Sequence, residues 1–254
     1  MKRKVLERDE SRQRIRQYLA LEGPVHKNQI RHEADAGSHP VVLPLIDELE
    51  KDGEIESVAQ HPTRLDDKTG YVIRGRKPVK YYDLTSYGVV RLISKLKVDA
   101  SIFDILAQKY QDVFPGIFDV WPLLNKGKRG IFARERLLFV AGLAATSLKQ
   151  VISDQTLPKE IREGAIHDVL NNSATIFWDP ASQMRGRSLM VTWDAILGKD
   201  ENLRTRVIEA IIRQDLHNIG LRVMQFRNLG IDQQSPELVR RYEQVLEMLW
   251  QRTP

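Results

Sequence analysis

The segment from residue 61 to residue 80 concentrates side chains that could bind a polyanion. Its cations are Arg64, Lys68, Arg74, Arg76, Lys77 and Lys80. Only two carboxylates, Asp66 and Asp67, lie among them, and Gly70 and Gly75 let the segment bend. Arg and Lys neutralise phosphates and release the counterions condensed around them. The segment is therefore a candidate phosphate-binding hairpin, and the competing interpretation is a solvated hairpin whose charges only maintain solubility.

Motifs for catalysis or metal binding are missing from the sequence. The chain has no cysteine, which excludes disulfides and thiolate metal sites. Six histidines are scattered without the His-Glu-x-x-His spacing of a metal site: His26, His32, His39, His61, His167 and His217. Residues 125–130 (Asn-Lys-Gly-Lys-Arg-Gly) lack the residue order of a phosphate loop, so an ordinary basic turn is expected there. We expect no enzyme, no cofactor and no metal site.

Three short helices are predicted between residues 11 and 53. The first starts near Ser11 and stops at Gly23, the second covers about 28–34 with Asn28 at its start, and the third ends at Gly53. Their apolar faces are defined by Ile15, Tyr18 and Leu19, by Ile30 and Ala34, and by Val42, Leu45, Ile46 and Leu49.

Pro44 lies within the third apolar stripe. Proline lacks the N–H that a helix interior needs. The third helix is therefore expected either to start late, with Pro44 in its first turn, or to kink at that residue.

Two β-prone runs follow, at 54–58 and 79–84, and the polar stretch between them predicts a hairpin with a long tip. Thr85 is suited to cap a fourth helix. The apolar face of that helix is predicted to be Val89, Leu92, Ile93 and Leu96.

In order and spacing, these elements resemble the winged helix-turn-helix domain of transcriptional regulators, a class that includes the multiple-antibiotic-resistance and phenolic-acid repressors. Three stretches carry the resemblance: the helix-turn-helix through Leu49, the step Leu49-Glu50-Lys51-Asp52-Gly53-Glu54-Ile55, and the run Tyr-x-Leu-Thr-x-x-Gly at Tyr82 to Gly88. Together they cover about the first two-fifths of the chain.

The resemblance implies that the third helix approaches the major groove of DNA and that segment 61–80 forms the wing. The residues expected to contact DNA are then Lys27, Gln29, Arg31, Ser38, His39, Arg64, Lys68, Arg74, Arg76, Lys77 and Lys80. The third helix departs from the usual pattern, because its outward residues include no Arg, Lys, Asn or Gln to bond base edges. These are His39, Val41, Leu43, Pro44, Asp47 and Glu48. We expect a DNA-binding transcriptional regulator that contacts duplex DNA mainly through its wing.

The alternative is a winged-helix protein-interaction module or adaptor without sequence-specific DNA reading. In that case the apolar surface of Val41, Leu43 and Pro44 would meet another protein. Salt-dependent binding to duplex DNA distinguishes the two hypotheses.

The composition predicts a globular protein. The chain has 254 residues, 42% of them hydrophobic, a net charge of +5 and a pI near 9.3, a balance compatible with a polyanionic partner. Charged residues follow the basic start 1–4, so no secretory signal is expected. The apolar run 137–148 is about half a bilayer span, so we expect no membrane segment and a cytoplasmic protein.

Helical periodicity dominates after residue 97. We expect a mainly α protein with two domains, a winged helix at 1–97 and an all-α domain at 98–254 for oligomerisation, partner contact or effector binding. An effector pocket could use the four tryptophans, Trp121, Trp178, Trp193 and Trp250. A homodimer seam could use the last predicted helix through Leu238, Tyr242, Val245, Leu246 and Leu249, although that helix could equally dock on its own domain.

Overall fold

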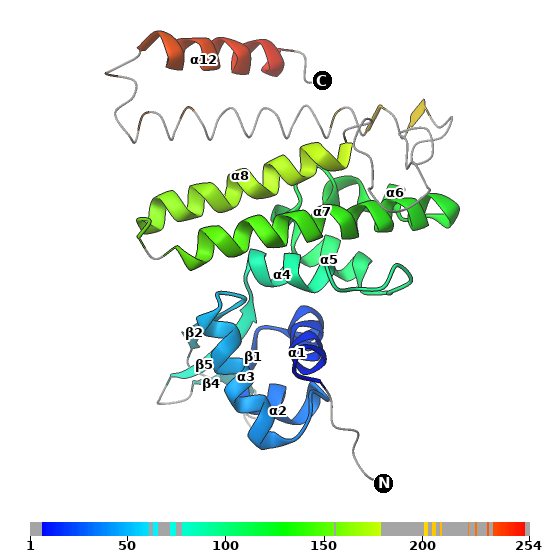
Figure 1. Cartoon of the computed structure of the whole chain (residues 1–254), viewed down its shortest axis with the longest axis vertical. Helices are drawn as coiled ribbons and strands as arrows, with labels where there is room; N and C mark the ends of the chain where they lie inside the picture. The colour runs from blue at the N-terminus through cyan, green and yellow to red at the C-terminus, as the bar shows by residue number, and fades with distance from the viewer. Residues whose placement is uncertain are drawn as a thin grey trace. The chain divides into compact units, whose positions relative to one another are not determined.

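The computed structural model describes residues 7–60, 63–65, 72–74, 78–154, 156–178 and 236–251, with isolated positions between 201 and 233. Within this part the protein is mainly helical and carries a small three-stranded antiparallel sheet (Figure 1), which confirms the mainly α fold class at this level. Contacts divide the chain into two compact units, Met1–Leu96 and Lys97–Pro254.

The amino-terminal unit contains four helices in its described part: α1 (Arg8–Glu22), α2 (Lys27–Glu33), α3 (His39–Lys51) and α4 (Ser86–Ile93). The predicted apolar faces form its core, except Tyr18, which is only half-buried and donates its hydroxyl to Glu33. Ile15, Ile30, Val42 and Leu49 are fully buried, and α1 packs against α2, α3 and α4. Burial of these faces, rather than helix propensity, is what stabilises helices this short.

The start of α2 differs from the prediction, and the structure excludes one of the two alternatives left open for α3. Asn28 does not cap α2; the cap is His26, whose Nδ1 accepts from the Asn28 N–H at 3.2 Å while Gln29 Oε1 accepts from the His26 N–H at 3.0 Å. Helix α3 does not start late, because it begins at His39 and contains Pro44. Val42, before the proline, is fully buried, so packing keeps the first turn helical.

The predicted hairpin is confirmed. Strand β2 (Ile55–Gln60) pairs antiparallel with β5 (Val79–Leu84), from Ile55 opposite Leu84 to Gln60 opposite Val79. A two-residue strand that the sequence did not predict, β1 (Val25–His26), pairs with the other edge of β5. Two further strands, β3 (Thr63–Leu65) and β4 (Val72–Arg74), form a separate antiparallel pair.

The sequence motifs around Gly53 and Thr85 interlock at the base of the hairpin. Gly53 has φ 72° and ends α3, as predicted. The Thr85 hydroxyl donates to the Gly53 carbonyl at 2.7 Å and accepts from the Gly88 N–H at 3.1 Å, so it caps α4 as expected. The Thr85 N–H donates to the Glu54 carbonyl at 3.2 Å.

Replacing Gly88 by Ala is expected to destabilise this junction. A Cβ at residue 88 would lie 1.9 Å from the Glu54 carbonyl oxygen, so backbone must shift, at a cost of about 1–3 kcal/mol. Hydrogen exchange of the α4 and β5 amides in the full chain measures the loss. The matched control is Gly142→Ala, where a Cβ meets nothing within 4 Å and protection should be kept or improved. Unchanged α4 protection in Gly88→Ala contradicts the close approach.

A buried ion cluster joins α1 to the start of the hairpin. The Glu54 carboxylate, 3% exposed, accepts from Arg16 Nε and from Arg12 Nη2, the latter at 2.9 Å. Arg16 is itself only 4% exposed, and Arg12 also bonds Asp52 at 2.5 Å. A third cation, Arg91, lies 3.8 Å from Glu54 Oε1 through its Nε, and these cations compensate a carboxylate that would otherwise be costly to bury.

The described part of the carboxy-terminal unit is helical. It consists of α5 (Phe103–Lys109), 3₁₀ turns at Gln111–Val113 and Phe118–Val120, α6 (Trp121–Leu124), α7 (Gly127–Ser153), α8 (Lys159–Trp178) and α12 (Pro236–Trp250). Helices α7 and α8 pack side by side (Figure 1). The fully buried Arg136 on α7 donates to the last carbonyls of α8, at Phe177 and, at 3.0 Å, at Ile176.

Two expectations for this unit are corrected or left open. The basic turn expected at 125–130 is helical from Gly127 onward, as the start of α7. Residues 203–229, which belong to the expected all-α domain, lie largely outside the described residues.

Candidate nucleic-acid interface

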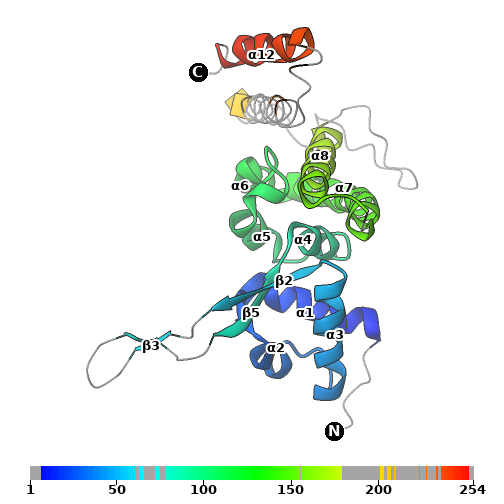
Figure 2. The same cartoon turned by 90° about the vertical axis from the view of Figure 1, so that its left-hand side faces the viewer.

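The wing candidate is an extension of the β2–β5 hairpin. Beyond the last β2–β5 pair, β3 and β4 pair again, with Thr63 opposite Arg74 and Leu65 opposite Val72. Figure 2 shows β3 well away from α1, α2 and α3. The backbones of Arg64 and Arg74 therefore lie in a β ladder, although their side chains are not described. Three more candidates, Lys68, Arg76 and Lys77, lie outside the described residues.

Lys80, at the base of the hairpin, is paired with an acid of α3. Its side chain is 61% exposed, and its Nζ lies 3.5 Å from Glu50 Oε1. The same Glu50 oxygen accepts from the Ser57 hydroxyl at 2.5 Å. The Glu50 carboxylate is thus held by Ser57 of β2 on one side and lies near Lys80 on the other.

Lys27, on α2, is also paired with an acid of α3. Its Nζ lies 2.5 Å from Asp47 Oδ1, and Asp47 is 63% exposed. Asp47 and Glu50 are three residues apart and so face neighbouring sides of one turn of α3. The structure therefore brings Lys27 and Lys80 to α3, each against a carboxylate.

The remaining candidates on α2 make local contacts, and the other two lie at the start of α3. The Gln29 side-chain oxygen completes the α2 capping box, and Arg31 Nη2 lies 2.7 Å from His32 Nε2. Ser38 is the exposed residue before α3, and its hydroxyl makes no capping bond to that helix. His39 is the first residue of α3, but its side chain is not described. Contact of any of these residues with DNA stays a prediction.

Further ion pairs compensate the acids at the end of α3. Arg8 bonds Glu48, and Arg12 bonds Asp52. The hydrogen bond from Arg8 lowers the pKa of Glu48 below its ordinary value. This pair therefore favours the folded state above the ordinary Glu pKa, and the contribution is lost as the pH falls through the lowered value. Neither Arg8 nor Arg12 was among the candidate residues, and no local pattern indicates these pairs, because the partners are 40 residues apart in sequence.

Of the four tryptophans predicted to line an effector pocket, only Trp121 has a described side chain. Trp121 is fully buried against Phe103 and Phe118, with its Nε1 donating to Asp104 at 3.0 Å, so it belongs to the core. Trp193 lies outside the described residues, and the side chains of Trp178 and Trp250 are not described.

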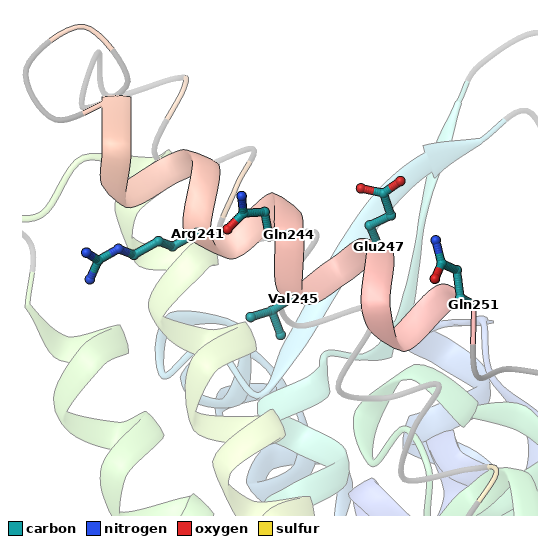
Figure 3. A pocket seen from close by; sticks show the side chains of 5 residues that line it. All are labelled: Arg241, Gln244, Val245, Glu247 and Gln251. Carbon is teal, nitrogen blue, oxygen red and sulfur yellow. The ribbon is translucent and has the colours of Figure 1, made fainter.

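A hollow along α12 is lined by side chains of that helix (Figure 3): Arg241, Gln244, Val245, Glu247 and Gln251. All five lining residues within the described part of the chain come from α12 and the residue just after it. Val245, from the predicted dimer seam, is 38% exposed, while the side chains of its predicted neighbours in the seam are not described.

Comparison with known proteins adds no relative, because no protein-family model, no curated protein and no solved structure matches the chain. Among the described helices, none combines the length and the apolar character needed to cross a membrane. In the same residues, no group of three or more His, Asp or Glu side chains is arranged to hold a metal ion.

Proposed function

We propose that the chain is a cytoplasmic DNA-binding transcriptional regulator. In this proposal the amino-terminal unit is a winged helix, and segment 61–80 is a wing that contacts the phosphates of duplex DNA. The carboxy-terminal helical unit then serves oligomerisation, partner contact or effector binding.

The observation that carries the proposal is the continuation of the hairpin into the β3–β4 ladder. This pairing includes the backbones of Arg64 and Arg74, and the sequence from 64 to 77 holds five cations against two carboxylates. In contrast, the cations Arg8, Arg12 and Lys27 of the helical body are engaged with acids of α3 or the residues after it. The positive field available to a polyanion is therefore expected to come from the wing.

The proposal is tested by a pull-down of DNA from native lysate. The full chain is used as bait, and the lysate is divided into nuclease-treated and untreated halves. We expect DNA to be recovered without nuclease, and proteins retained through it to be lost after treatment. Failure to recover nucleic acid, together with undiminished protein capture after nuclease, contradicts the proposal.

A protein-interaction module is the second candidate, and the surface of α3 favours it. Val41 is 45% exposed and Pro44 is exposed, so α3 offers an apolar patch next to Asp47. Such a patch is suited to a protein contact rather than to base edges. Under this hypothesis, Val41→Ser should release a captured protein while leaving any DNA retention unchanged.

A further inference from the structure

The outer face of α3 lacks residues that read base edges and carries acids that phosphates repel. Between Pro40 and Glu50 this helix has no Lys, Arg, Asn or Gln, the residues that make paired hydrogen bonds with base edges. Its charged positions there are acids, and Asp47 is 63% exposed while Glu48 is 33% exposed. Insertion of α3 into a groove would bring these carboxylates toward phosphates.

The neighbouring cations do not reverse this charge. Lys27 lies 2.5 Å from Asp47, and Lys80 lies 3.5 Å from Glu50. If Lys27 left Asp47 for a phosphate, the uncovered carboxylate would repel that same phosphate. Gln29, the amide of α2 among the candidate contacts, already uses its oxygen in the capping box.

We propose that the amino-terminal unit binds duplex DNA through contacts to its phosphates, without preference for base sequence, while α3 stays out of the major groove. This inference rests on the proposed DNA-binding function and names its substrate class. Contacts to phosphate fix position and affinity but carry no direct sequence information. A wing that supplies all the contacts therefore yields binding that depends on salt and not on sequence.

The test compares wild type with Asp47→Asn in the full chain, using fluorescence anisotropy with a labelled duplex and selection from a random duplex pool. Glu10→Gln is the matched control, because Glu10 on α1 is also an exposed acid paired with one cation, Arg14, at 3.0 Å. We expect wild type to bind without enriching a motif. Asp47→Asn should match Glu10→Gln in affinity within about twofold and leave the salt slope unchanged.

Two results separate the failure of this inference from the failure of the proposed function. The inference alone is overturned if wild type enriches a sequence motif. It is also overturned if Asp47→Asn binds about tenfold more tightly than the control, with a slope of log affinity against log salt that is steeper by about one, because α3 then lies against the DNA. Absence of duplex binding by wild type at low salt overturns the proposed function and, with it, the inference.

Discussion

Replacing Arg74, Arg76 and Lys77 together by Gln is expected to weaken duplex binding by roughly two to three orders of magnitude at about 0.1 M salt. Each phosphate contact releases about 0.9 of a counterion, so loss of three contacts should also flatten the slope of log affinity against log salt by nearly three. Anisotropy titrations of the full chain at several salt concentrations measure both quantities.

A matched triple variant in the carboxy-terminal unit controls for net charge. Lys149, Lys159 and Arg241 are exposed, and their replacement by Gln removes the same charge from residues outside the wing. This control should keep its slope, with affinity within a few fold of wild type. Equal loss in both triple variants, or no loss in the wing variant, removes the wing from the mechanism.

Replacing Glu54 by Leu is expected to lower the free energy of unfolding of the amino-terminal unit by about 3–5 kcal/mol. The carboxylate is 3% exposed and lies between Arg16 and Arg12, so its removal leaves the buried Arg16 guanidinium without its acid. The α1 and β5 amides of the full chain should exchange correspondingly faster, because opening of this unit exposes them.

Two further variants make the Glu54 result interpretable. Glu56→Leu changes an exposed residue of β2 and should stay within about 0.5 kcal/mol of wild type. Adding Arg16→Met to Glu54→Leu removes the stranded cation and should recover part of the loss. Unaltered exchange in Glu54→Leu shows that the cluster does not stabilise the unit.

The sequence predicted those parts of the fold that depend on local patterns and not on contacts between residues far apart in the sequence. The apolar stripe Val42, Leu45, Ile46 and Leu49 identified α3, and Thr85 identified the start of α4. Strand β1 escaped prediction because two residues have no periodicity, and its pairing with Tyr81 and Tyr82 is decided by tertiary structure. The start of α3 was left open between a late start and a kink at Pro44, because the burial of Val42 that holds the first turn is a tertiary effect.

The candidate site was predicted only as a set of cations. Residue type alone marked Lys27 and Lys80 as suited to phosphate, but their partners Asp47 and Glu50 are 20 and 30 residues away in sequence. Those pairs depend on how α2 and the β2–β5 hairpin pack against α3, which no local pattern encodes. The structure therefore changes the expectation for α3, whose acids pair with two of the candidate cations, more than the expectation for the wing.

The slope of log affinity against log salt for wild-type protein on a duplex of about 20 base pairs tests the central claim most directly. If the five cations between Arg64 and Lys77 each neutralise one phosphate, the slope should lie at about −4 to −5. A slope near zero, or no binding at about 50 mM salt, contradicts a wing that holds DNA by its phosphates.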